Sequence, residues 1–470
     1  MNLLQQANEY LRMKCYDEAI RVYVEALQTY QPLTHVILPS LERAQACREM
    51  ARSSVDLPRV LICGWDLSGN AVGRVHTLAE IYKEIADVGV IGCFFSNRGD
   101  IFWTPMKRVC SIIDSIQVQD QRNFIPQAVK LVLNNPCDIL HLSKPRFPNI
   151  LIGILYKLVW NSCVFMDIDD EELAFVSAEE ALRPDEYLTI HSCLPKLDDL
   201  TGKGWTQIGV ALARIFDGVT VVNPPLQQRY GGAIVRHARD ESVFKPSLER
   251  RQSSRAMLGI TPEQKIILFL GTPRAHKGLL ETAKAIATLE RDDVLFLIVG
   301  DFPMSLQWLK AEIEGLSNLN KRFLANQPFE NIPDILAAGD LCVLLQDPDN
   351  LAAQFQTPAK LSDALAMGLT VLAEPTPALA DLAEKGAFQP VSRSNLSEVL
   401  GAALNQISGV HGEPTAHPVF NEYLSIVSNR PVVESLMNAH KCNPRQFFHN
   451  NPSLKIVAKI ANLEFLLPVH

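Results

Sequence analysis

Two cations, Arg274 and Lys277, stand in a short turn between an apolar run and a segment with helical periodicity. The apolar run, residues 266–270, predicts a buried parallel strand that ends at Gly271. Residues 279–289 repeat apolar side chains at helical spacing, so the cations precede a helix N-terminus, whose free N–H groups favour anions. A guanidinium fork and an ammonium at such a place suit a diphosphate. A solvated basic turn without a ligand is the alternative for this motif alone.

A second motif further along the chain favours the diphosphate interpretation. Residues 356–373 indicate a loop, a helix, a glycine stop and another core strand. Lys360 and Asp363 fall on the first turns of that helix, where a ligand would lie. A carboxylate there can accept two hydrogen bonds from a ribose diol, and the lysine can add a phosphate or ribose contact. Together the two motifs describe one half of a nucleotide site.

These motifs resemble the donor-phosphate turn and the ribose-binding helix of glycosyltransferases with two facing Rossmann-like domains, the GT-B fold. The most similar group is the retaining family-four-like glycosyltransferases, glycosyl transferases group 1. The resemblance covers roughly residues 58–405. It implies that Gly271, Arg274 and Lys277 bind the donor diphosphate, and that the two cations act in catalysis by stabilising the leaving group.

The resemblance also implies a place for the nucleobase and shows one departure from the family. The loop 326–329, which contains Pro328, stands where the family packs the base. The family often has two glutamates eight residues apart on the ribose-binding segment. Here Asp363 stands at the second position and Phe355 at the first, which leaves the contacts to the donor sugar open.

Strand and helix patterns alternate from residue 59 onward, which predicts an α/β protein with parallel sheets covered by helices on both faces. Helices are expected at residues 75–86 and 147–160 of the first domain. The expected strands are residues 60–63, 88–95, 137–142, 163–168 and 218–222 in the first domain, and 266–270, 294–299, 341–345 and 369–373 in the second.

A glycine-rich loop follows the first expected strand. Gly69, Gly73 and Arg74 resemble the family's first phosphate-facing loop, and glycines allow close approach of the backbone to a ligand. The loop does not match a Gly-x-Gly-x-x-Gly fingerprint, which disfavours a dehydrogenase.

Charged residues follow two neighbouring strands of the first domain. His141, Lys144 and Arg146 come after one strand, and Asp169 after the next. Because ligands bind at the carboxyl ends of parallel strands, we expect a sugar-binding rim on the acceptor side here. Mutual ion pairing at the sheet edge is the alternative, and His141 can equally be structural.

Asp169 takes the place of a histidine that contacts the donor sugar in many members of the resembled family. Together with His141 it is our candidate for catalysis, either by holding a sugar hydroxyl or as a general base. The second role would favour inversion, whereas the resemblance implies retention. We expect no metal, because the predicted cations already neutralise the leaving diphosphate, although residues 167–169 have the spelling of an Asp-x-Asp motif.

Length and composition describe an ordinary globular protein of two or three domains: 470 residues, 47% hydrophobic, with a net charge of −8. The acidic balance argues against nucleic-acid binding. We expect no signal peptide and no transmembrane span, since the most apolar stretch, residues 147–160, is short and contains Lys157. Ten scattered cysteines without a Cys-x-x-Cys pair favour a reduced, cytoplasmic protein, with peripheral contact to an inner membrane left open.

Four regions are expected. Residues 1–52 form a helical segment that resembles one tetratricopeptide repeat, or a plain helical hairpin, and dock on the body or on a protein partner. Residues 53–240 form the acceptor-side Rossmann-like domain, and residues 241–410 the nucleotide-sugar-binding domain. Residues 411–470 are a helical tail that crosses back to the first domain, as the resemblance implies.

The function that these observations imply is that of a glycosyltransferase in polysaccharide or other glycan assembly. It would move a sugar from a UDP- or GDP-sugar to a glycan, lipid-linked or protein acceptor, without a further cofactor. A sugar-nucleotide epimerase of the same fold and a catalytically weakened scaffold are the alternatives.

Overall fold

The computed structural model describes residues 2–51, 57–347, 349–407, 413–438 and 441–467. The chain divides into two units by its internal contacts. Unit 1 comprises Met1–Trp103, Ser111–Thr220 and Val433–His470, and unit 2 comprises Thr104–Cys110 and Val221–Val432. The predicted boundaries at residues 52/53 and 410/411 lie outside the described residues.

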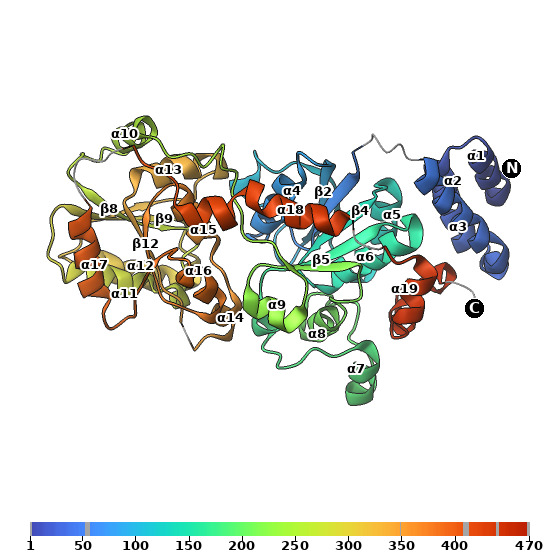
Figure 1. Ribbon diagram of the computed structural model, residues 1–470. Helices are drawn as coiled ribbons and strands as arrows, with labels where there is room; N and C mark the ends of the chain where they lie inside the picture. The colour runs from blue at the N-terminus through green and yellow to red at the C-terminus, as the bar shows by residue number, and fades with distance from the viewer. Residues whose placement is uncertain (1, 52–56, 348, 408–412, 439–440, 468–470) are drawn as a thin grey trace. The chain divides into compact units, whose positions relative to one another are not determined.

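The first sheet has the strand order β3-β2-β1-β4-β5-β6-β7, with parallel pairing from β3 through to β5. Its central strands are buried along almost their entire length because helices cover the sheet on both sides (Figure 1). The strands are β1 (Arg59–Gly64), β2 (Asp87–Phe95), β3 (Ile112–Val118), β4 (Ile139–Ser143), β5 (Cys163–Ile168), β6 (Gly218–Val221) and β7 (Ala233–Ile234).

Helix α6 is buried over its entire length, which explains its almost unbroken apolar sequence. Its single charge, Lys157, is tolerated because the ammonium pairs with the Asp217 carboxylate at 2.8 Å in the same unit. The other helices of this unit are α4 (Val72–Tyr82), α5 (Phe124–Asn134), α6 (Phe147–Trp160), α7 (Pro184–His191) and α8 (Lys203–Ala211).

The N-terminal helices α1 (Leu3–Arg12), α2 (Tyr16–Thr29) and α3 (Thr34–Ala51) lie side by side (Figure 1) and pack on their own unit. The Trp160 ring of α6 is flanked by the guanidinium groups of Arg21 and Arg48, at 5.8 and 5.5 Å from its centre. On the tail, Arg445 of α19 (Pro444–Asn450) donates two hydrogen bonds to Glu42 of α3. Helix α20 (Leu454–Ile460) follows.

The second sheet, in unit 2, has the order β10-β9-β8-β11-β12-β13, with parallel pairing. Alternate residues of β8 enter two separate cores: Ile266 and Leu268 one, Ile267 and Phe269 the other. The strands are β8 (Lys265–Leu270), β9 (Val294–Val299), β10 (Lys321–Leu324), β11 (Leu341–Leu344), β12 (Thr370–Ala373) and β13 (Gln389–Pro390).

Helices cover both faces of this second sheet. One core is closed by α13, α15 and α16, with α10 packed on α13, and the other by α11, α12 and α17 (Figure 1). The helices whose bounds begin in this unit are α9 (Pro224–Tyr230), α10 (Leu248–Met257), α11 (Leu279–Ala287), α12 (Gln307–Glu314), α13 (Ile332–Ala338), α14 (Leu351–Phe355), α15 (Ala359–Ala366), α16 (Ala380–Glu384), α17 (Leu396–Gln406) and α18 (Ile426–Met437).

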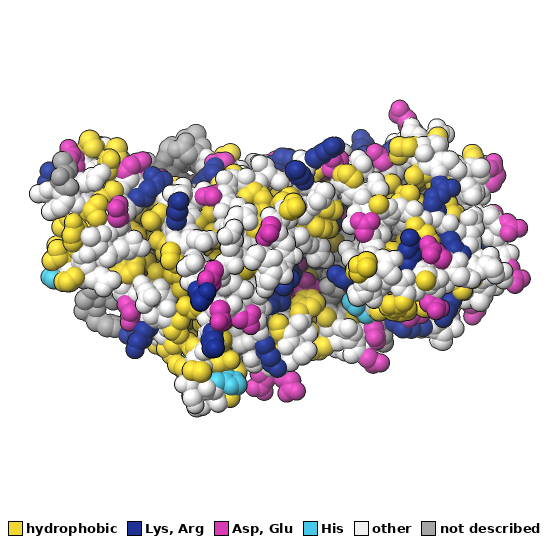
Figure 2. Space-filling view, turned by 180° about the vertical axis from the view of Figure 1, so that it is seen from behind, with side chains coloured by type: hydrophobic (Ala, Val, Ile, Leu, Met, Phe, Trp, Pro, Cys, Tyr) yellow, Lys and Arg dark blue, Asp and Glu magenta, His cyan; other side chains and the backbone are white. Residues whose placement is uncertain are grey.

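The structure confirms the predicted alternation: each of the nine expected strands is present within a residue or two. Four further strands, β3, β7, β10 and β13, were not predicted. Charges of both signs are interspersed over the face shown in Figure 2. None of the described helices combines the length and the apolar character that a membrane span requires.

Candidate active site

The predicted cationic turn follows β8 in unit 2. Gly271 has a φ of +116° there. The backbone of Gly300 approaches it so closely that a Cβ added to Gly300 would lie 2.3 Å from the Gly271 oxygen. Lys277 Nζ donates to the Thr272 oxygen at 3.2 Å, and Arg274 is exposed. Helix α11 begins directly afterwards, and no side chain caps its N-terminus. The turn thus presents cations and backbone N–H groups at one end of a helix.

Lys360 of α15 reaches the same place from the other predicted motif. Its Nζ lies 3.8 Å from the centre of the Phe269 ring, and its Cε lies 3.8 Å from where a Cβ on Gly271 would be. Burial, and then the charge of Lys277, lower the pKa of Lys360 to about 7. The two lysines therefore share one electrostatic environment at the carboxyl end of β8.

His276 lies near Arg274, the third cation of the predicted site. Its pKa is lowered by burial first, and then by the charges of Lys277 and Arg274. The charges of Arg274, Lys277 and Lys360 therefore all act on this one imidazole. Their mutual repulsion makes the cluster a receptor for an anion.

Asp363 lies one turn after Lys360 and is buried. Its Oδ1 accepts a hydrogen bond from Arg239 Nε at 2.5 Å, and burial raises the pKa of the carboxyl against the opposing effect of that guanidinium. Arg239 also lies 5.5 Å from the ring centre of Phe329, which follows Pro328 in the predicted nucleobase loop. The predicted ribose acid and base loop therefore share one neighbour, which sequence reasoning did not single out.

Phe355, at the position of the family's first glutamate, ends helix α14. The guanidinium of Arg229 lies 5.6 Å from its ring centre. Asn223 Nδ2, fully buried in the same unit, donates to the Phe355 oxygen at 2.7 Å and to Thr357 Oγ1 at 3.1 Å. An aromatic ring and a fixed backbone thus replace a carboxylate.

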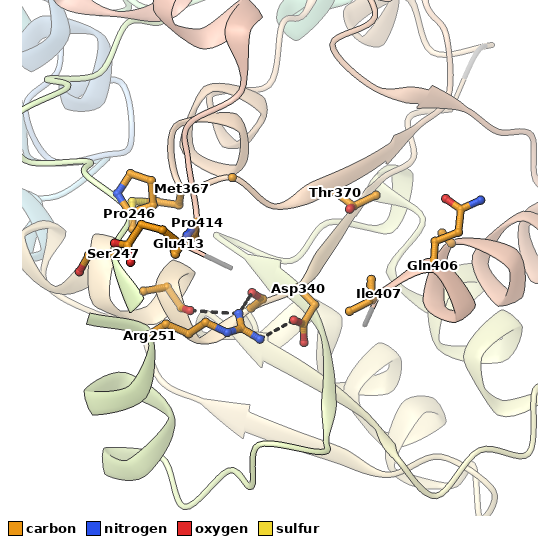
Figure 3. Close-up of a pocket in the computed structure, with 14 residues that line it drawn as sticks. Pro246, Ser247, Arg251, Asp340, Met367, Thr370, Gln406, Ile407, Glu413 and Pro414 are labelled. Atoms are coloured by element: carbon orange, nitrogen blue, oxygen red, sulfur yellow. Dashed lines mark hydrogen bonds and ion pairs between the residues drawn. The ribbon is translucent and has the colours of Figure 1, made fainter. Parts of the chain in front are cut away.

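A cavity of about 460 Å³ lies elsewhere in unit 2, at the amino ends of β11 and β12. Figure 3 shows Arg251 donating to Asp340 beside it, at 2.5 Å, and to the Gly339 oxygen at 2.7 Å. Its lining includes Thr370 and Gln406 but none of the predicted site residues. Because ligands of open parallel sheets bind at the carboxyl ends of strands, the cationic cluster is the better candidate site.

Arg74, in unit 1, is enclosed and does not line an open surface. It is 2% exposed, and its Nε and Nη2 donate to the two carboxylate oxygens of Asp167 at 2.8 and 2.6 Å. Burial raises the pKa of Asp167, but the charge and hydrogen bonds of Arg74, together with His141 and the hydrogen bond from Thr220, hold that pKa below its usual value. The helix α4 begins at Val72, so Gly73 and Arg74 lie on its first turn and not in the predicted loop. A Cβ added at Gly69 or Gly73 would meet nothing within 4 Å, so both glycines border open space.

His141 is fully buried inside the first sheet. Its Nε2 lies 3.0 Å from Thr220 Oγ1, which itself donates to Asp167, and its Nδ1 lies 3.2 Å from the Tyr82 hydroxyl. Burial lowers the pKa of His141 to about 4, so the ring is neutral at neutral pH. In this geometry His141 supports the Asp167 carboxylate from within the sheet.

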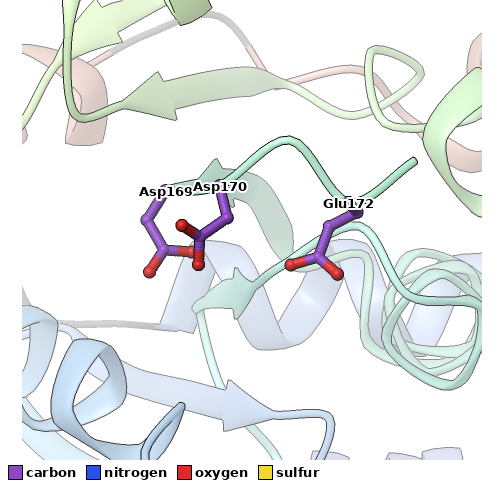
Figure 4. A group of neighbouring side chains, drawn as sticks. All are labelled: Asp169, Asp170 and Glu172. Carbon is purple, nitrogen blue, oxygen red and sulfur yellow. The ribbon is translucent and has the colours of Figure 1, made fainter. Parts of the chain in front are cut away.

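Asp169 follows β5 and belongs to a cluster with Asp170 and Glu172, whose carboxylates lie within 4.8 Å of one another (Figure 4). Lys144 Nζ contacts all three, at 2.6, 2.5 and 3.2 Å. Arg146 pairs with Glu172 at 2.5 Å. The charged residues of the two strand ends therefore pair with each other, as the alternative interpretation proposed.

The Asp169 carboxyl is nevertheless chemically distinct. Burial, helped by the charges of Asp170 and Asp167 and opposed by Lys144, raises its pKa to about 7. A carboxyl with such a pKa can exchange a proton at neutral pH, which is the property required of a general acid or base.

Comparison with known proteins gives a family for the segment that holds the cationic cluster. Residues 264–407 match the family Glycosyl transferases group 1. A search of curated protein sequences gives no significant match.

Solved structures share the fold over most of the chain at low identity. HepE of Anabaena in complex with UDP-glucose has a TM-score of 0.59 and 16% identity, over 81% of this chain and 99% of HepE. A glycosyltransferase from Rickettsia africae ESF-5 has a TM-score of 0.53 and 14% identity, over 86% of this chain and 98% of that one. Sucrose-phosphate synthase from Thermosynechococcus elongatus has a TM-score of 0.50 and 15% identity, over 87% and 99%. These similarities confirm the predicted arrangement of parallel sheets.

Proposed function

We propose that this chain, a group 1 glycosyltransferase with the GT-B fold, takes its sugar from a uridine or guanosine diphosphate donor that binds to unit 2. The observation that carries the proposal is the convergence of Arg274, Lys277 and Lys360 at the carboxyl end of β8. The segment that matches the family contains all three residues. HepE, which shares the fold, was solved with UDP-glucose, so UDP-glucose is the first donor to test.

The cations would bind the diphosphate and stabilise the charge that grows on it as the glycosidic bond breaks. Gly271 lets the backbone lie close to the phosphates, and the uncapped N-terminus of α11 adds N–H donors. Asp363 would accept hydrogen bonds from the ribose hydroxyls, and the loop with Pro328 would contact the base. No further cofactor is needed for this step.

The acceptor would be a glycan, a lipid-linked glycan or a protein, held by unit 1. Asp169, with its pKa of about 7, would accept the proton of the attacking hydroxyl or hold a sugar hydroxyl. Lys144 is the group that would have to shift or share its contact for the first role. The buried His141 and Thr220 would keep Asp167 in place behind it. Retention or inversion follows from which role Asp169 takes.

We place the enzyme in the cytoplasm, with peripheral membrane contact and a protein partner as further proposals. The N-terminal helices pack on the rest of unit 1, where their Arg21 and Arg48 lie against the Trp160 ring. This contact occupies one face of the helices. On the outside, Leu33, Val36 and Met50 remain 42, 46 and 76% exposed. This exposed apolar surface on residues 1–52 is what supports a partner.

The test is a transfer assay with isotopically labelled UDP-glucose and a GDP-hexose against extracted glycans, lipid-linked glycans and proteins. Our proposal expects an acceptor whose mass increases by one hexose residue, with release of the nucleoside diphosphate. Conversion of the donor to its epimer without any acceptor would establish the epimerase alternative instead. A protein that neither binds nor turns over a nucleotide sugar would be the scaffold alternative.

A further inference from the structure

The backbone of Arg239 forms two hydrogen bonds with residues 424–426, a segment distant in sequence. Its N–H donates to the Leu424 oxygen at 2.9 Å, and its own oxygen accepts from the Ile426 N–H at 3.0 Å. All three residues belong to unit 2. The Arg239 side chain therefore starts from a fixed point and not from a free loop.

The guanidinium is equally constrained. It lies beside two neighbouring aromatic rings, 5.5 Å from the centre of Phe329 and 5.8 Å from that of Phe244, and its Nη1 donates to the Ala238 oxygen at 2.9 Å. Its Nε contacts Asp363 Oδ1 at 2.5 Å, and both side chains of this pair are 10% exposed. A guanidinium that is held in this way restrains the orientation of the carboxylate to which it donates.

Asp363 depends on this partner for its charge as well as its orientation. Burial raises its pKa, and the groups that face it are Arg239, Lys360 on its own helix and the Cys342 thiol of β11. Lys360 is itself only about half protonated at pH 7, because burial and the charge of Lys277 lower its pKa to about 7. Arg239 is therefore the permanent positive charge beside Asp363.

We propose that Arg239 is a positioning residue: it holds the Asp363 carboxylate in the orientation in which it accepts the ribose hydroxyls, and so sets how strongly the site prefers a ribose diol. The inference rests on the proposed function, since it assigns a role within the same donor site. The alternative is an ion pair that only stabilises unit 2. The two differ in one observable: only a positioning role changes the discrimination between nucleotides with and without the diol.

The experiment compares the affinities of UDP and 2′,3′-dideoxy-UDP by titration calorimetry, on the full chain. In the wild type we expect UDP to bind at least about tenfold more tightly than the dideoxy compound, because only UDP can donate hydrogen bonds to the charged carboxylate. Arg239→Gln should reduce this ratio below about threefold, through weaker UDP binding, with the dideoxy compound nearly unaffected. In the variant, the remaining preference should increase as pH rises, because Asp363 then needs a higher pH to ionise.

Arg236→Gln is the matched control. Arg236 lies three residues earlier, pairs with Asp381 in unit 2 and donates to the Val222 oxygen, whereas the cations that act on Asp363 are Arg239 and Lys360. Its loss removes a comparable buried ion pair. The control should lower stability while the diol ratio keeps its wild-type value.

Two further variants keep the proposal testable if Arg239→Gln fails to fold. Arg239→Lys retains the charge without the fork and should give an intermediate ratio. Asp363→Asn should bring the ratio near one, and adding Arg239→Met to it should change the ratio no further, because the effect of Arg239 passes through Asp363.

A wild-type ratio that survives in Arg239→Gln, or in Arg239→Lys when the glutamine variant does not fold, would overturn the inference while leaving the proposed function intact. If UDP does not bind, GDP and ADP with their dideoxy forms replace it. A wild-type protein that binds none of them would overturn the proposed function itself.

Discussion

Lys360 Nζ lies 3.8 Å from the centre of the Phe269 ring, so an ammonium from helix α15 covers an aromatic face at the end of β8. The ring offers only a weak partner to the cation, and the charge of Lys277 opposes it. An empty site therefore holds its positive charge at a cost. A bound diphosphate would remove that cost, which links nucleotide binding to a proton.

The first prediction is proton uptake on nucleotide binding. The pKa of Lys360 is about 7 without an anion, and a diphosphate would raise it toward the usual range of lysine. The bound state then holds more protons, so the affinity should fall as pH rises above 7, by at most about tenfold per pH unit. Titration calorimetry of UDP at pH 8 in two buffers of different ionisation enthalpy measures the uptake.

Lys360→Met should abolish this uptake, and the exposed Lys284→Met on α11 should retain it. The account of Lys360 fails if the proton uptake of Lys360→Met equals that of the wild type.

A second prediction concerns Asp169. If it acts as a general base, kcat/KM should rise with pH and level off above about 7, the pKa to which burial raises this carboxyl. In Asp169→Asn this pH-dependent limb should disappear, and turnover should fall by about 10²–10⁴-fold. Asp170→Asn, one residue on, should keep the limb. An unchanged pH profile in Asp169→Asn would remove the base assignment.

A third prediction concerns metal dependence. Lys144 Nζ already contacts Asp169, Asp170 and Glu172, so its charge compensates the cluster that could hold a cation. Turnover should therefore persist in excess EDTA. Lys144→Met, which empties the centre of the cluster, should gain thermal stability from added Mn²⁺, whereas the wild type should not. Loss of wild-type activity in EDTA, restored by Mn²⁺, would contradict this view of the cluster.

A fourth prediction separates two roles of Arg74. Because its guanidinium and the Asp167 carboxylate form a buried bidentate pair, Arg74→Met should lower the free energy of unfolding by about 3–5 kcal/mol. Urea denaturation measures this loss, and Arg74→Met/Asp167→Asn should recover part of it. A variant with wild-type stability but weaker UDP binding would favour the phosphate-facing role that the sequence suggested.

Much of the fold could be predicted because a parallel sheet covered on both faces requires strands that are apolar throughout. Residues 266–270 and 294–299 are such strands, and both are buried. The missed strands β3, β7, β10 and β13 lie at the ends of their sheets. Strands β3 and β10 include polar residues such as Asp114 and Lys321, and β7 and β13 are two residues long. Edge strands are partly solvated, so their sequences do not differ from those of loops.

The site could be predicted where its residues stand within one motif and not where it depends on distant partners. Arg274 and Lys277 share a turn, and their place before a helix indicates their chemistry. Arg239 lies 124 residues from Asp363 in sequence, in a polar stretch without a pattern. Its role appears only once the fold brings the pair together, and the same holds for the partner of Arg74.

The most direct test of the account is a thermal-shift titration with UDP, GDP, ADP and dTDP. Its subjects are the wild type, Arg274→Ala/Lys277→Ala and the control Lys284→Ala. One nucleotide should stabilise the wild type and the control, by about 2.7 kcal/mol at a hundred times its Kd, and should leave the double variant unchanged. If no nucleotide stabilises the wild type, or if the double variant responds equally, the cationic turn of unit 2 is not the donor site.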